Sequence, residues 1–149
     1  MLKDIKVLEF EGLAPTLFCG MYFADQGAQV ILVGRKEPAP FSILINQNLM
    51  NRGKIWITLS PKVPKEKRTI EELIANSDII IDPFRPGVLE KLNLGPEFIF
   101  KINKKAILLR VSGYGQSGPM SLKPGHDLNY ISTSGIVPMI NCNNRSKVS

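Results

Sequence analysis

The sequence predicts an α/β fold in which helices flank an open parallel β-sheet. Short apolar segments rich in Val, Ile and Leu alternate with segments of helical character along most of the chain, and this alternation is typical of parallel sheets. The first strand, helix and second strand lie within about 30 residues and form one βαβ unit. Some strands are almost continuously apolar, as expected when both faces of a sheet are covered. The predicted architecture is therefore Rossmann-like.

Five strands are predicted from apolar runs that end at turn signals. The fourth run, for example, contains Ile79-Ile80-Ile81 and is stopped by Pro83, which cannot donate a backbone hydrogen bond to a sheet. The predicted strands cover residues 5–10, 29–33, 54–59, 78–82 and 105–111.

The predicted helices are recognised from their ends. Gly27 suits the position after a helix, where a positive φ is common, and Pro96 suits a first turn. Thr69 and Glu72 have the spacing of a capping box, so a helix is expected to begin at Ile70, after a basic loop over 61–67. The helices are expected over residues 16–26, 70–76, 86–92, 96–103 and 126–135.

Composition indicates one globular domain over residues 1–140, followed by a disordered Asn-rich tail over 141–149. The chain has 149 residues, of which 44% are hydrophobic and 21% charged, and these proportions are ordinary for a folded domain. Residues 34–51 show no regular pattern. No apolar run approaches the roughly 18 residues that span a bilayer, and the first residues do not have the pattern of a signal peptide. We therefore expect no membrane partner.

The number of cysteines and the net charge limit the compartment and the kind of partner that the sequence allows. Cys19 and Cys142 are too few and too far apart for a disulfide framework or a metal site, which favours an intracellular compartment. The net charge of +6 suits an anionic partner, which could be a nucleic acid, an acidic lipid or a phosphorylated small molecule. No helix-turn-helix, zinc or RRM pattern accompanies the charge, so nucleic acid is not the expected partner.

A glycine-rich segment follows the fifth predicted strand. Its residues Gly113 to Gly118 match the pattern G-x-G-x-x-G, which in dinucleotide-binding folds opens a helix. Pro119 and Pro124 prevent a helix from starting there, and no acidic residue lies about 20 residues further on to bind a ribose. The segment therefore predicts a ligand loop, without NAD or FAD as its ligand.

His126 is the single histidine of the chain, and its place favours a chemical role over a structural one. It follows Gly125 at the start of a predicted helix, just after the glycine-rich loop. A helix N-terminus favours the neutral imidazole, which can accept a proton. Arg35 and Arg85 directly follow the second and fourth predicted strands, so both could reach the carboxyl edge of the sheet and bind an anionic nucleotide tail.

Several segments together resemble the family III CoA-transferase superfamily and, within it, the α-methylacyl-CoA racemases. The strongest runs are Ser112–Pro119 and the Gly-His-Asp-x-Asn-Tyr motif at 125–130, whose histidine favours the racemase branch. The other matching segments, in the same order and spacing, are residues 12–15, 18–19, 24–28, 52–54, 83–88 and 90–96.

The resemblance implies a specific reaction. The racemases invert the carbon α to a CoA thioester by 1,1-proton transfer through an enolate. His126 would move the proton on one face of that carbon. An Asp supported by a Glu would serve the other face, and the match places both beyond residue 149. By this match the chain is the N-terminal lobe of the family fold, truncated before the second catalytic group.

The same resemblance implies the partners and the binding residues. A 2-methylacyl-CoA would be the substrate, with no separate cofactor and no metal, and full-length members form homodimers. In a eukaryote the compartment would be mitochondrial or peroxisomal. The residues implied to bind the acyl-CoA are Arg35, Leu59, Lys62, Arg85, Lys91, Gly125 and Tyr130.

Two other functions remain open from the sequence. One is a catalytically inactive CoA-binding module or dimer partner. The other is a general anion-binding surface formed by the basic residues, which would bind any polyanion in a salt-sensitive way.

Overall fold

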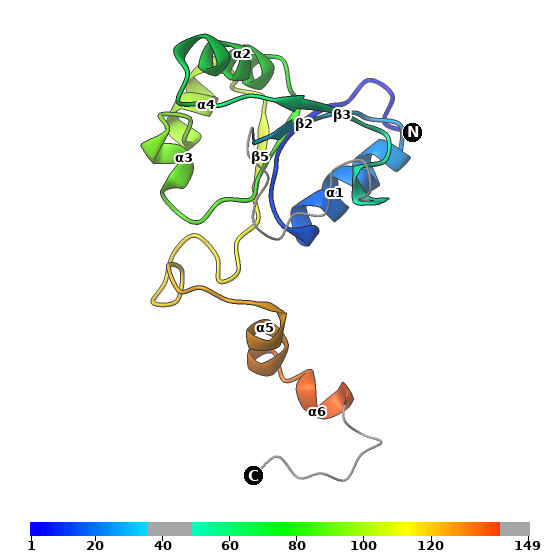
Figure 1. Cartoon of the computed structure of the whole chain (residues 1–149), viewed down its shortest axis with the longest axis vertical. Helices are drawn as coiled ribbons and strands as arrows, with labels where there is room; N and C mark the ends of the chain where they lie inside the picture. Colours follow the sequence, from blue (N-terminus) through cyan, green and yellow to red (C-terminus); the bar gives the residue numbers. More distant parts are fainter. Residues whose placement is uncertain (36–48, 141–149) are drawn as a thin grey trace.

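A five-stranded sheet forms the centre of the computed structural model, which describes residues 1–35 and 49–140 (Figure 1). The strands lie in the order β3-β2-β1-β4-β5. All neighbouring strands are parallel, so the predicted open parallel α/β sheet is confirmed. The strands are β1 Lys6–Phe10, β2 Gln29–Gly34, β3 Lys54–Thr58, β4 Ile79–Asp82 and β5 Ile107–Arg110.

The strand order fixes where a ligand can bind. The chain starts at the centre of the sheet, winds outward through β2 to β3, and then continues on the other side of β1 with β4 and β5. The winding therefore reverses between β1 and β4. In open parallel sheets the crevice beyond the carboxyl ends of the strands at such a point is the usual ligand site.

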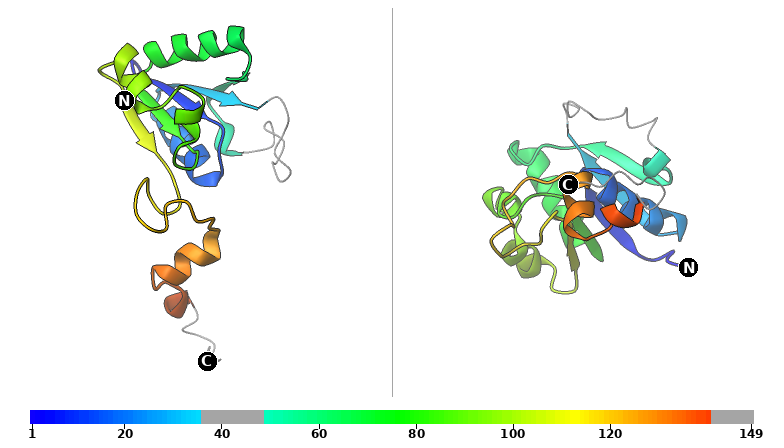
Figure 2. Two further views of the ribbon diagram at one scale, coloured as in Figure 1. Left: turned by 90° about the vertical axis from the view of Figure 1, so that its left-hand side faces the viewer. Right: turned by 90° about the horizontal axis from the view of Figure 1, so that it is seen from below.

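Helices cover the two faces unequally. Helix α1 packs on one face, and α2, α3 and α4 pack on the other, whereas α5 and α6 extend away from the sheet as an arm (Figure 2). The helices are α1 Ala14–Asp25, α2 Pro64–Ala75, α3 Val88–Lys91, α4 Pro96–Ile102, α5 Asp127–Thr133 and α6 Val137–Ile140, with a 3-10 turn η2 Leu49–Asn51.

Each face of the sheet has its own apolar core. Successive side chains of a strand point to opposite faces, so Leu8 of β1 joins the core beneath α2 to α4, whereas Val7 joins the core beneath α1. Ile70 and Ile74 of α2 and Ile99 of α4 are completely buried in the first core. The apolar core beneath α1 is the smaller of the two because a single helix covers that face of the sheet.

A buried ion pair lies beneath α1. The Nζ atom of Lys54 is 2.7 Å from Oε2 of Glu9, and both side chains are fully buried. The same ammonium donates a hydrogen bond to the carbonyl of Leu17 in α1 (2.8 Å). A Cβ added to Gly20 would overlap the Glu9 carboxylate, so the glycine is what allows α1 to approach the pair.

The predicted start of α2 was wrong. The helix begins at Pro64, so most of the predicted basic loop is helical and Thr69 is an interior residue, not a cap. Proline fits the first turn because its missing N–H would have no partner there. Glu66 in that turn accepts a hydrogen bond from the N–H of Ser60 (2.7 Å), which closes the turn before the helix.

The predicted final helix is confirmed within two residues. It was expected over residues 126–135 and is observed as α5 Asp127–Thr133, and a short helix α6 that was not predicted begins at Val137. Gly135 has a φ of 76°, and this left-handed conformation ends helices because it turns the chain out of the helical path. The other predicted helices and strands end within one or two residues of the observed ones.

Two predictions fall partly or wholly outside the described residues. Most of the irregular segment 34–51 and the whole predicted tail 141–149 are in this group, so the predicted domain boundary stays a prediction. In the described part of the chain, no helix has the length and apolar character needed to cross a membrane.

Candidate functional site at the carboxyl edge of the sheet

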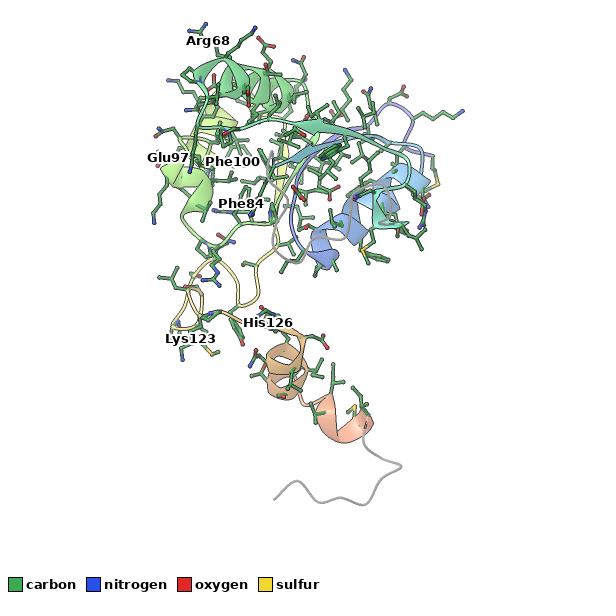
Figure 3. All side chains as sticks on the ribbon, in the orientation of Figure 1. Arg68, Phe84, Glu97, Phe100, Lys123 and His126 are labelled. Carbon is green, nitrogen blue, oxygen red and sulfur yellow. The ribbon has the colours of Figure 1, made fainter. Side chains whose placement is uncertain are left out.

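The sequence-predicted binding residues fall into two groups. Arg35 follows β2, Leu59 follows β3 and Arg85 follows β4, and because the strands are parallel these three residues share the carboxyl edge of the sheet. Lys62 lies in the turn between β3 and α2, and Lys91 is the last residue of α3. The second group, Gly125, His126 and Tyr130, belongs to the arm that begins beyond this edge (Figure 3).

A carboxylate ties the ends of β1 and β2 together at Arg35. The backbone N–H of Arg35 donates to Oε2 of Glu11 (2.8 Å), which leaves the arginine side chain exposed at the edge. A Cβ added to the neighbouring Gly34 would overlap the indole of Trp56. The backbone before Arg35 is therefore held from β1 and from β3.

A second carboxylate is fully buried at the end of β4. Oδ1 of Asp82 accepts a hydrogen bond from the N–H of Phe84 (2.9 Å), and Oδ2 accepts one from Nε of Arg110 (2.9 Å). Burial raises the pKa of Asp82 although both donors oppose the shift. This group fixes the first turn of the segment that contains Arg85.

Arg110 also reaches helix α3. Its Nη1 and Nη2 atoms donate to the two carboxylate oxygens of Glu90, at 2.8 and 3.3 Å. These hydrogen bonds lower the pKa of Glu90. Sequence reasoning missed this cluster. The available signal was an acidic residue at the end of the apolar run 79–81, because such a carboxylate is buried and needs a partner.

The glycine-rich loop packs against helix α5. A Cβ on Gly113 or on Gly125 would overlap the ring of Tyr130, and the Tyr130 ring meets the ring of Tyr114 edge-on with centroids 5.2 Å apart. The loop glycines are thus explained by close packing and, at Gly115, by a φ of 81°. The structure brings Gly113, Gly125 and Tyr130 together.

His126 occupies the N-cap position of α5 with extended backbone (φ −124°, ψ 175°). Its N–H donates to Oδ1 of Asn129 (2.9 Å), one turn along the helix and beside Tyr130. The imidazole is exposed, so it is accessible to a substrate at the start of the arm. Asn129 is the residue that fixes the backbone of His126.

No cluster of His, Cys, Asp and Glu side chains in residues 1–35 and 49–140 is arranged to hold a metal ion. The prediction that the chain uses neither a metal nor a separate cofactor remains a prediction.

Comparison with known proteins places these features in one family. The model of CoA-transferase family III matches residues 2–148. A CaiB/baiF CoA-transferase family protein of Caenorhabditis elegans is 45% identical over 92% of this chain, and alpha-methylacyl-CoA racemase of Mus musculus is 41% identical over 94%. The chain spans 38% and 35% of the lengths of these two relatives.

Solved structures agree with the sequence relatives. A CAIB/BAIF family protein from Brucella suis superposes with a TM-score of 0.81 at 27% identity, covering 90% of this chain and 39% of that one. Rv3272 from Mycobacterium tuberculosis gives a TM-score of 0.77 at 31% identity, covering 91% and 38%. The parallel sheet, the glycine-rich loop and the His126 segment are thus parts of one family fold, and the chain belongs to CoA-transferase family III.

Proposed function

We propose that this chain is the CoA-binding lobe of a 2-methylacyl-CoA racemase and supplies one of its two proton-transferring groups. One observation supports this most directly. Tyr130 fills the space left by Gly113 and Gly125, so the helix that begins after His126 is fixed against the glycine-rich loop at the carboxyl edge of the sheet. An accessible imidazole is thereby held next to a predicted ligand loop.

The chemistry of the reaction fits this arrangement. The proton on the carbon α to a thioester is weakly acidic, so a base must be placed close to it. The neutral imidazole of His126 takes the proton, and the C–H electron pair forms the carbon–carbon double bond of an enolate whose charge lies on the thioester oxygen. Return of a proton to the same face restores the original enantiomer, and return to the opposite face inverts it.

Inversion needs a second group on the opposite face. The family resemblance gives that role to an Asp that follows the segment matched by this chain. We therefore propose the complete racemisation for the longer family architecture, and CoA binding with proton transfer on one face for this chain. Arg35 and Arg85 at the sheet edge, with Lys62 and Lys91 nearby, would bind the phosphates of CoA.

Titration calorimetry with CoA and dephospho-CoA at two salt concentrations tests the binding step. We expect CoA to bind more tightly than dephospho-CoA, with a difference that shrinks at high salt because phosphate contacts are screened. Arg85→Ala should weaken binding, and Arg52→Ala, at the opposite edge of the sheet, should not. Equally negligible heats for both ligands would refute CoA binding, and equal affinity for any polyanion would favour a general anion-binding surface.

Hydrogen exchange in D₂O tests the chemical step. The two enantiomers of a 2-methylacyl-CoA are followed separately by mass spectrometry, and we expect deuterium uptake without inversion in one of them. His126→Ala should slow this uptake by about 10²–10⁴-fold and leave the affinity for CoA unchanged. Equal uptake by His126→Ala and the parent would refute the role of His126.

The second candidate function is an inactive CoA-binding module or dimer partner. The observation that favours it is that Arg35 and Arg85, the exposed residues proposed to bind the phosphates, directly follow strands of the sheet, whereas His126 lies on the arm. CoA binding without deuterium uptake in either enantiomer would support it over the racemase lobe.

A further inference from the structure

We infer that Arg110 is a positioning residue for binding of the CoA phosphates, acting through the segment between Pro83 and Lys91. The inference rests on the proposed function, because it assumes that Arg85 and Lys91 contact those phosphates. Arg110 itself does not touch the ligand.

Arg110 is bound to two carboxylates. Its Nε donates to Asp82 (2.9 Å), and its two terminal nitrogens donate to Glu90 (2.8 and 3.3 Å). The Arg110 side chain is only 15% exposed. A guanidinium with three of its five N–H groups bonded to carboxylates is held in one rotamer.

The segment from Pro83 to Lys91 is held by Arg110 at both ends. At its start, Asp82 joins Arg110 to the N–H of Phe84 (2.9 Å). At its end, Glu90 is next to Lys91 in α3. Arg85 lies between these two points and Lys91 directly follows the second one, and both side chains are exposed. Two cationic side chains are therefore carried by a backbone that one guanidinium holds at two points.

The backbone between the two ends is a compact turn. The N–H of Val88 donates to the carbonyl of Arg85 (3.2 Å), and the N–H of Lys91 donates to the carbonyl of Gly87 (3.1 Å). Gly87 has a φ of 84°. The turn therefore transmits the position of Asp82 to α3, and loss of Arg110 would release both ends of it together.

The charges of Asp82, Glu90 and Arg110 give the arginine a second effect on the binding of an anionic ligand. Asp82 and Glu90 carry two negative charges against the single positive charge of Arg110. Without the guanidinium, the exposed carboxylate of Glu90, next to Lys91, would be left unpaired and would repel an anionic ligand. The lysine in Arg110→Lys keeps the positive charge, but its ammonium cannot donate to three oxygens in a fixed fork. This variant therefore separates the effect of positioning on CoA binding from the effect of charge.

The test is a double-mutant cycle on the 149-residue chain with CoA as the probe. We expect Arg110→Lys to weaken CoA binding about tenfold, since one lost phosphate contact has roughly this effect. In the Arg85→Ala background the same change should weaken binding by less than about twofold, because the contact that Arg110 positions is already absent. A merely structural role would give equal losses in both backgrounds.

Arg52→Lys is the matched control. Arg52 makes a bidentate pair with Asp25 at the opposite edge of the sheet, so the same substitution disrupts the same geometry away from the site and should leave CoA affinity unchanged. Urea unfolding of each variant, followed by the fluorescence of Trp56, reports whether it is folded. If Arg110→Lys does not fold, Glu90→Gln weakens the contact that joins Arg110 to α3 and also removes one negative charge. Loss of positioning is expected to weaken binding about threefold, whereas the charge change alone would strengthen it.

The outcomes separate the inference from the proposed function. Unchanged CoA affinity in folded Arg110→Lys, or equal losses with and without Arg85, would overturn the inference while the parent still binds CoA. Failure of the parent chain to bind CoA would overturn the proposed function and, with it, this inference.

Discussion

Replacement of Lys54 by methionine tests whether the buried ion pair beneath α1 holds that face of the protein together. Glu9 and Lys54 are both fully buried, 2.7 Å apart. Methionine keeps most of the apolar stem of lysine and removes the ammonium, so the variant leaves the Glu9 carboxyl group without its charged partner. Breaking a buried pair from one side costs about 3–5 kcal/mol.

The pKa of Glu9 makes this cost depend on pH. Burial raises that pKa from 4.5 to about 7, although Lys54 opposes the shift. Because the folded-state pKa is raised, the stability that Glu9 contributes is present below pH 4.5 and is lost as the pH rises to about 7. At about 1.4 kcal/mol per pKa unit this loss is about 3 kcal/mol in the parent.

In Lys54→Met the opposing ammonium is absent, so the pKa of Glu9 rises above its value in the parent. Both proteins lose stability in parallel up to about pH 7. Above that pH the parent no longer loses stability through Glu9, whereas the variant continues to lose about 1.4 kcal/mol per pH unit. The difference in unfolding free energy between the two proteins should therefore widen between pH 7 and pH 9.

Urea unfolding at pH 6, 7, 8 and 9, followed by the fluorescence of Trp56, measures this difference. Arg52→Met is the matched control because it breaks an exposed pair with Asp25, whose side chains are 53% and 39% exposed, and it should cost a small fraction as much at every pH. A Lys54→Met variant that is as stable as Arg52→Met at pH 9, or a difference that does not change with pH, would refute the reasoning.

Two further predictions concern the glycine-rich loop and the uncovered sheet face. Gly113→Ala should detach Tyr130 from the loop and raise amide hydrogen exchange across residues 112–130. Gly115→Ala, where the φ of 81° disfavours a side chain but an added Cβ would meet no atom, should leave the exchange of Tyr130 unchanged. Equal effects of the two substitutions would refute the packing role. The 149-residue chain should self-associate through Ile107 and Leu109, which are 63% and 38% exposed on edge strand β5. Replacing both with lysine should shift sedimentation toward monomer, and a parent that is already monomeric would contradict this.

The sequence by itself determined the fold class and the family. Runs such as Ile79-Ile80-Ile81 are apolar because parallel strands are covered on both faces, and this burial leaves a local pattern that can be read without coordinates. The segment from Ser112 to Tyr130 also carries a local pattern, because its residue types and spacing alone identified CoA-transferase family III. Local backbone preferences also fixed most helix ends, since Pro restricts φ to values that suit a first turn and Gly readily adopts the positive φ that ends a helix.

Only the tertiary structure decided which distant side chains meet. Glu9 and Lys54 are partners because the order β3-β2-β1 puts their strands under the same helix, and the order of parallel strands is not written in any one segment. For the same reason Arg110 meets Asp82 and Glu90 only once β4 and β5 are neighbours.

The wrong predicted start of helix α2 has the same origin. Thr69 and Glu72 satisfy the capping-box spacing, but the helix could extend back to Pro64 because Ser60 found Glu66 as a partner across the preceding turn. A local motif states only which conformation is available to the backbone. Which of several available starts is used depends on the hydrogen bonds and the apolar burial that the rest of the fold provides.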